Sequence, residues 1–160
     1  MKIKLFPRIS LVLSFAFITC APTQPFDVAA EKATIQTVIE TSIGWALTKD
    51  KQALYDAVAR DSAFFIINPD SSAVDGFAEF RNVVENFFML DDFKATHFEV
   101  KQLRIHISQS GDAAWYSAVL DDFGEFKGRS TSWNNVRWTG VLEKRDSRWV
   151  IVQMHFSFPK

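Results

Sequence analysis

Residues 133–159, WNNVRWTGVLEKRDSRWVIVQMHFSFP, decide the fold of this 160-residue chain. Two runs rich in Val, Ile, Trp, Phe and Thr flank the tetrad Arg-Asp-Ser-Arg at 145–148. This pattern predicts a β-hairpin with a tight turn. With the two central residues of the tetrad in the turn, its two arginines pair, and counting outward places Trp138 opposite His155.

Strand alternation assigns the side chains of this hairpin to two faces. Trp138 and His155 share one face with Leu142, Trp149 and Ile151. The other face takes Arg137, Thr139, Val141, Val150, Val152 and Phe156. A bulge or a one-residue slip in the pairing would exchange the faces of one strand.

Helical spacing dominates the first half of the chain and strand patterns the second. Three helices are expected: one that begins after the predicted N-cap Asp27, one after the predicted N-cap Asp50, and one over 77–88. A short strand is expected at 63–68, and long strands at 96–109, 113–123, 132–145 and 149–158. Helices followed by strands predict an α+β domain, in which about three helices cover one face of an antiparallel sheet.

The hairpin also carries a family resemblance. Its residues are, in order, Arg137, Thr139, Val141, Leu142, Lys144, Arg148, Trp149, Ile151, Val152, His155 and Ser157. This order resembles the last two strands of SnoaL-like domains in the nuclear transport factor 2-like superfamily, and the resemblance covers residues 30–159. It implies a curved antiparallel sheet that forms a cone with a ligand cavity at its mouth. It implies no single activity, because the superfamily includes isomerases, cyclases, dehydratases and association domains.

The N-terminus has the pattern of an export signal. Three cations within residues 1–8 precede an apolar run at 9–19 that is too short to span a bilayer. Residues 1–19 are therefore predicted to be a signal peptide, and the protein is expected in the periplasm of a bacterial cell.

Cys20 follows the apolar run directly and is the only cysteine of the chain. Its position resembles the lipid-attachment cysteine of bacterial lipoproteins, which implies that a lipid anchor tethers the protein to the membrane. Ordinary signal cleavage near Ala21 is the alternative. Residues 20–29 are then the anchor and tether, and 30–160 the SnoaL-like domain. A single cysteine excludes an intramolecular disulfide.

Charge and missing motifs exclude several classes of function. The formal net charge is −1 for the whole chain, and the 15 basic and 19 acidic residues left after 1–19 give −4. Without a basic stripe, nucleic acid is not expected as a partner. The sequence has no Gly-rich phosphate loop, no Cys-x-x-Cys and no His-Glu-x-x-His, and only three histidines. Neither a metal nor another cofactor is expected.

Three polar residues are candidates for catalysis. Asp121 and Asp122 are consecutive near the end of a predicted strand, so one lies on each face. An inward carboxyl group among aromatic rings would have a raised pKa and could transfer protons as in an isomerase or cyclase. The alternative is that both aspartates are solvated at the end of the strand. His155 interrupts an apolar strand. It could act as a general base or donate a hydrogen bond to a ligand, and the alternative is that it has only structural partners.

The candidate ligand-binding residues are Trp115, Trp133, Arg137, Trp138 and His155. The tryptophans can line a mouth for a flat apolar ligand, although Trp115 and Tyr116 are consecutive and only one of them can face inward. The resemblance implies that an inward Arg137 binds an anion such as a carboxylate, and a cross-strand ion pair is the alternative.

Three functional hypotheses follow from the sequence. The first is an exported domain that binds a small, partly apolar molecule without catalysis. The second is a proton-transfer enzyme that uses an inward aspartate with His155, which requires both side chains in one pocket. The third is a homodimeric interaction module that pairs through the sheet.

Overall fold

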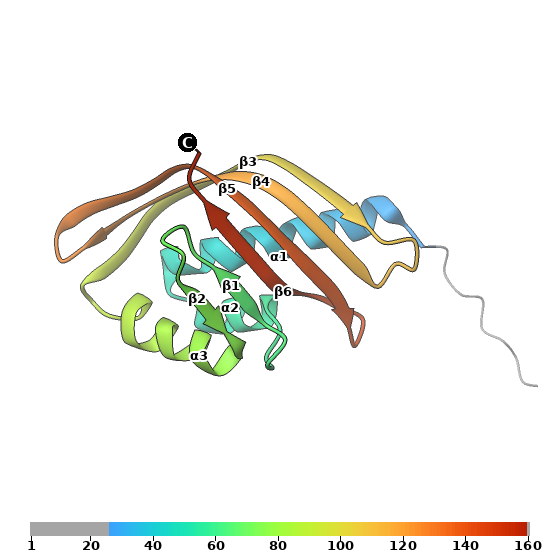
Figure 1. Ribbon diagram of the computed structural model, residues 1–160, viewed down its shortest axis with the longest axis horizontal. Coiled ribbons are helices and arrows are strands. Elements are labelled where there is room, and N and C mark those ends of the chain that lie inside the picture. The colour runs from blue at the N-terminus through green and yellow to red at the C-terminus, as the bar shows by residue number, and fades with distance from the viewer. Residues whose placement is uncertain (1–25, 160) are drawn as a thin grey trace, which may run out of the picture.

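Three helices cover one face of a six-stranded sheet in the computed structural model of the protein, which describes residues 26–159 (Figure 1). The predicted signal peptide 1–19 and the lipid-attachment candidate Cys20 lie outside the described residues. The predicted α+β class, with about three helices on a curved sheet, is confirmed.

The helices are α1 (Val28–Thr48), α2 (Lys51–Ala57) and α3 (Gly76–Val83), and α3 continues as the π-helical turn η1 (Val84–Phe88). The strands are β1 (Phe65–Ile67), β2 (Ala73–Asp75), β3 (Phe93–Ile107), β4 (Ala113–Phe126), β5 (Arg129–Arg145) and β6 (Arg148–Ser157).

Two aspartates begin the first helices, as the sequence predicts. The Oδ1 atom of Asp27 accepts hydrogen bonds from the backbone N–H groups of Ala29 and Ala30, at 2.9 and 3.1 Å. Asp50 accepts one from the N–H of Ala53 at 3.0 Å. These bonds satisfy amide groups that have no partner within a helix, and so they fix where α1 and α2 start.

The sheet is curved, as the family resemblance implies, and it is not closed; it is mixed, whereas the strand pattern predicted an antiparallel sheet. Its strand order is β2-β1-β6-β5-β4-β3. The four long strands pair antiparallel, but β1 runs parallel to β6. The short strand β2 pairs with β1 and was not predicted, because three residues carry too little alternation to be recognised. Figure 1 shows β3, β4 and β5 arching over the helices.

The hairpin of β5 and β6 has the predicted turn, and Arg145 pairs with Arg148. A bulge follows, because Leu142 pairs with Ile151 while Val141 pairs with Gln153. Trp138 consequently lies opposite Phe156, so the prediction that it faces His155 is wrong. The physical reason is the one extra residue in β6, which shifts the alternation of the rest of the strand.

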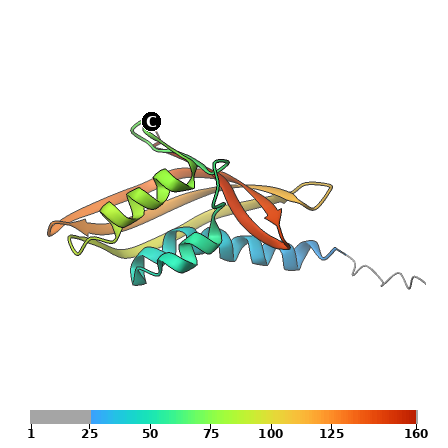
Figure 2. The same cartoon turned by 90° about the horizontal axis from the view of Figure 1, so that it is seen from below.

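The side of the sheet that packs on the helices is called the inner face, and the opposite side the outer face. Ile35 and Ile39 of α1 are fully buried, as are Leu120, Trp138 and Leu142 of the sheet. Seen from below, α3 lies toward one side of the sheet and α1 with α2 toward the other, with strands visible between them (Figure 2).

Gly140 of β5 allows Tyr116 to lie flat against the inner face. A methyl group on Gly140 would lie 2.6 Å from Tyr116 Cε1 and 2.6 Å from the carbonyl oxygen of Gln153. Both distances are far inside van der Waals contact, so Gly140→Ala is expected to lower the free energy of unfolding by about 2 kcal/mol or more. The measurement is urea unfolding, with Thr139→Ala on the outer face as the control, for which a loss below about 1 kcal/mol is expected. Equal losses in the two variants would contradict the close packing.

Candidate functional site

A carboxyl group lies between two aromatic side chains on the inner face. In the sheet, Asp122 of β4 pairs with Phe98 of β3 on one side and with Trp133 of β5 on the other. Paired residues point to the same face, and both aromatic rings pack against the hydrophobic core. Phe98 also reaches α1, because a methyl group on Gly44 would lie 2.9 Å from its ring. Asp122 is therefore the inward member of the predicted aspartate pair.

Desolvation raises the pKa of Asp122 to about 6. A hydrogen bond from the backbone N–H of Phe123 acts in the opposite direction but is the smaller effect. Within residues 26–159, Asp122 has no salt bridge and no side-chain hydrogen-bond partner. A partly buried carboxyl group without such partners can accept a hydrogen bond from a ligand or exchange a proton near neutral pH.

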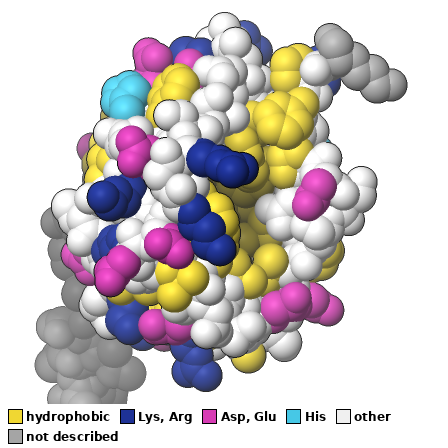
Figure 3. Space-filling view, turned by 90° about the vertical axis from the view of Figure 1, so that its left-hand side faces the viewer, with side chains coloured by type: hydrophobic (Ala, Val, Ile, Leu, Met, Phe, Trp, Pro, Cys, Tyr) yellow, Lys and Arg dark blue, Asp and Glu magenta, His cyan; other side chains and the backbone are white. Residues whose placement is uncertain are grey.

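Trp133 connects this carboxyl group with the end of the chain. Its ring lies 5.5 Å from that of Phe156 and 6.1 Å from that of Phe158, between centroids. Phe158 is half exposed, whereas Phe156 is buried. Figure 3 looks at the left-hand end of the molecule in Figure 1, the end with the β4–β5 turn, and shows a hollow lined by hydrophobic side chains with Lys or Arg side chains beside it.

Deeper on the inner face lie two polar atoms without partners. The hydroxyl group of Tyr116 and the indole Nε1 of Trp138 are buried and form no hydrogen bond with any residue that the structure describes. Their rings meet edge to face at 5.1 Å, and Trp138 stacks on Phe156 at 5.7 Å. Burial raises the pKa of Tyr116 well above its ordinary value, so the hydroxyl group stays protonated and neutral.

Asp121 faces the other way and has a structural environment. Its carboxylate binds Lys101 Nζ at 2.6 Å and accepts a hydrogen bond from the backbone N–H of Asn135 at 2.6 Å. Asn135 has a positive φ of 54° at an irregularity in the β4–β5 pairing, so Asp121 holds this distorted backbone. Lys101 is the main cause that lowers the pKa of Asp121.

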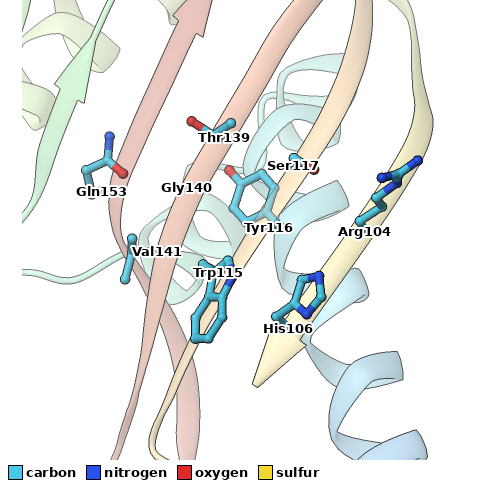
Figure 4. A pocket seen from close by; sticks show the side chains of 9 residues that line it. All are labelled: Arg104, His106, Trp115, Tyr116, Ser117, Thr139, Gly140, Val141 and Gln153. Carbon is cyan, nitrogen blue, oxygen red and sulfur yellow. The ribbon is translucent and has the colours of Figure 1, made fainter. Parts of the chain in front are cut away.

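His155, Arg137 and Trp115 also lie on the outer face. His155 pairs with Thr139, and Arg137 precedes Thr139 by two residues in β5. Trp115 is 50% exposed and stacks on His106, with centroids 5.7 Å apart. A hollow of about 420 Å³ opens beside this stack; we call it the outer hollow (Figure 4).

The structure thus divides the predicted site residues between two faces. Asp122, Trp133 and Trp138 are on the inner face, and Asp121, Arg137, Trp115 and His155 are on the outer face. The proton-transfer hypothesis with both residues requires Asp122 and His155 in one pocket. Because they lie on opposite faces of the sheet, this requirement is not met. Arg137 is exposed on the outer face and not deep in a cavity.

Sequence reasoning did not find three residues near these sites. Phe98 lies beside Asp122 only through the pairing of β3 with β4, which no local pattern shows. Arg104 and His106 line the outer hollow, but an irregularity between Lys101 and Arg104 interrupts the alternation of β3. Helical and strand periods are local signals, whereas cross-strand neighbours depend on register.

Two further observations concern metals and membranes. Within residues 26–159, no group of three or more His, Cys, Asp or Glu side chains is arranged to hold a metal ion. No helix in this part of the chain has the length and apolar character that crossing a membrane requires.

The comparisons with known proteins agree with the fold. The family model of the SnoaL-like domain matches residues 35–160, so the chain belongs to the SnoaL-like domain family. No curated protein matches the sequence.

Solved structures with the same fold come from distant organisms. A nuclear transport factor 2-like superfamily protein of Salmonella enterica is 20% identical with a TM-score of 0.70, covering 84% of this chain and 94% of its own. An NTF2-like protein of unknown function from Prochlorococcus is 19% identical with a TM-score of 0.64, at coverages of 81% and 93%. The association domain of CaMKII from C. elegans is 21% identical with a TM-score of 0.61, at coverages of 81% and 97%. At such identities the likeness shows the fold alone.

The opposite environments of the two aspartates predict opposite effects on stability. An unfolded aspartate titrates near pH ~3.9, and folded Asp122 near 6. Between these values the folded state keeps a proton that the unfolded state has lost, so the free energy of unfolding falls as the pH rises. Asp122→Asn removes this loss and is expected to be more stable than wild type at pH 8, by about 2 kcal/mol, with no such gain near pH 3.5.

Asp121→Asn is the matched control. The pKa of Asp121 is lowered in the folded state, so its contribution is present above the unfolded pKa and is lost as the pH falls through the folded value. This variant is expected to be less stable than wild type at pH 8, and the difference should fade in acid. Thermal unfolding at both pH values measures the two effects, and effects of the same sign would contradict the assignment of faces.

Proposed function

We propose that the protein binds a small, partly apolar molecule at the inner-face end of the sheet, beside Asp122 and Trp133. The observation that carries this proposal is the carboxyl group of Asp122, which lies between Phe98 and Trp133, has no side-chain partner among residues 26–159 and has its pKa raised to about 6. The aromatic side chains supply apolar contact, and the carboxyl group supplies one oriented polar contact. Binding sites for small molecules commonly combine these two features.

The charge of Asp122 indicates the polar part of the ligand. Above pH 6 the group is mostly ionised and accepts hydrogen bonds only. A hydroxyl, amide or amine group on the ligand would satisfy it, and such a bond to an ionised acceptor is stronger than one between neutral groups. The ring of Trp133, with those of Phe156 and Phe158 at centroid distances of 5.5 and 6.1 Å from it, offers an apolar surface to the rest of the ligand.

Proton transfer is the second candidate, favoured by the same raised pKa. A base is most effective when its pKa lies near the working pH, and Asp122 fulfils this without His155. A test reaction is the isomerisation of cyclohex-3-enone to its conjugated isomer, which begins with removal of a proton next to the carbonyl group. If the wild-type protein catalyses this reaction, and Asp122→Asn abolishes the activity while Asp121→Asn retains it, the role of Asp122 as a base is supported. If the wild-type protein shows no turnover, this role is contradicted for this substrate class.

Export and a lipid anchor on Cys20 belong to the same proposal. Their support is the short cationic start followed by an apolar run that ends at the only cysteine. In the bacterium, intact-mass measurement of the detergent-extracted protein is expected to show a diacylglyceryl group on Cys20. A mature N-terminus that begins after Cys20 would contradict the anchor and leave a periplasmic protein.

The homodimer stays a prediction. Its support is an uncovered outer face and the similarity in fold to an association domain. Sedimentation velocity over a wide concentration range tests it: a dimer is expected, and a monomer throughout would contradict it.

The binding proposal predicts how a neutral aromatic amine behaves. N-phenyl-1-naphthylamine has two apolar ring systems and one N–H donor, and its fluorescence reports binding. The dissociation constant is expected to fall as the pH rises through about 6, because ionised Asp122 is the better acceptor. Asp122→Asn should abolish this pH step, and Trp133→Ala should weaken binding about tenfold at every pH.

The control for this experiment is Phe123→Ala, which removes an aromatic ring that is stacked on His97 on the outer face and does not line the outer hollow. It should leave both the affinity and the pH step unchanged. If Trp133→Ala and Asp122→Asn bind like wild type, the inner-face site is wrong.

A further inference from the structure

The outer hollow is built from two neighbouring rows of side chains that cross four strands. Arg104, Ser117, Thr139 and His155 are successive partners across β3, β4, β5 and β6, and form the polar row. The first three line the hollow, and His155 lies outside its lining. His106, Trp115, Val141 and Gln153 are partners in the same order, and form the aromatic row. Figure 4 shows Arg104 and His106 on one side of the hollow, Trp115 in the middle and Gln153 on the other side.

The polar row has hydrogen-bonding groups without protein partners. Within residues 26–159, the side chains of Arg104, Ser117 and Thr139 form no hydrogen bond with another side chain or with the backbone, and Arg104 has no salt bridge. A guanidinium group offers five donors in a planar fork that matches a carboxylate. The hydroxyl groups lie on the adjacent strands and can donate to the same anion.

No carboxylate competes for this cation in the hollow. Its lining contains no Asp or Glu. Elsewhere on the outer face, Asp121 is paired with Lys101 at 2.6 Å and Glu143 with Arg145 at 2.8 Å, and Glu99, the partner of Asp121 on β3, lies outside the lining of the hollow. The hollow therefore has a net positive character, supplied by Arg104.

The aromatic row offers a flat apolar surface beside these donors. Trp115 is held in place by the nearly parallel His106 ring, with an interplanar angle of 10°. Trp115 is 50% exposed and Val141, its partner on β5, is 37% exposed. A ring laid on Trp115 and Val141 would place a substituent over the polar row.

We propose that the outer hollow is a second binding site, which takes a small carboxylate carried on a flat apolar ring. The carboxylate binds Arg104 and the Ser117 hydroxyl group, and the ring packs on Trp115 and Val141. A volume of about 420 Å³ accommodates a molecule of this size. This site is independent of the inner-face site, because the sheet separates them.

A second copy of the chain is the less suitable occupant of this hollow, so the predicted homodimer would pair through another part of the outer face. A two-fold contact centred here would bring hollow against hollow and Arg104 near its own copy. Such a contact would leave a void and place like charges close together, and neither favours association.

The test uses 2-naphthoate and its neutral counterpart 2-naphthamide, titrated into the purified protein by calorimetry. Arg104→Gln is expected to weaken naphthoate binding at least about tenfold and to leave naphthamide binding unchanged, because only the carboxylate forms a charge-assisted bond. Trp115→Ala should weaken binding of both. Arg148→Gln, which removes an exposed positive charge at the β5–β6 turn, should change neither.

Three outcomes would overturn the proposal. In the first, Arg104→Gln and Arg148→Gln affect naphthoate binding equally, so that only general charge matters. In the second, Trp133→Ala abolishes binding while Trp115→Ala does not, which places the ligand on the inner face. In the third, naphthoate does not bind and the protein sediments as a dimer that Trp115→Ala dissociates, which places a second copy on the hollow. Arg104 and Trp115 are exposed, so circular dichroism should show that their variants fold normally.

Discussion

One extra residue in β6 decides which side chains of the last strand reach the helices. Beyond the bulge, Met154 and Phe156 point inward opposite Gly140 and Trp138, and His155 points outward. The bulge lies where the chain after α2 joins the sheet, since the N–H of Ala59 donates to the carbonyl oxygen of Ile151 at 2.8 Å. Without the bulge, an imidazole would replace Phe156 in the core and would have to lose its hydration there.

The consequence of this register is two faces with different chemistry on the same strands. Neighbouring residues have opposite environments: Asp122 is desolvated between aromatic rings, whereas Asp121 is ionised and bound to Lys101. Tyr116 is buried against Gly140, whereas Trp115 is half exposed beside the outer hollow. The helices make this difference, because they remove water from one face and leave the other open.

Local signals in the sequence predicted much of this fold. The caps at Asp27 and Asp50, the turn between β5 and β6, and the order of helices and long strands all depend on residues close together in the chain. The parallel pairing of β1 with β6 joins segments far apart in the sequence and was not predicted. The site followed the same division. Alternation showed that one of two aspartates faces inward, but only the register identified Asp122 as that residue. The register also moved His155 from the face of Trp138 to that of Arg137 and Thr139.

The central claim is that Asp122 is a desolvated inner-face carboxyl group that serves a ligand. Its most direct test is a carbon-detected NMR titration of the side-chain carboxyl groups of Asp121 and Asp122 in the folded protein. The structure predicts a pKa near 6 for Asp122 and one below the ordinary aspartate value for Asp121. If Asp122 titrates at or below the ordinary value of ~4, it is solvated or paired, and the inner-face site loses its polar group.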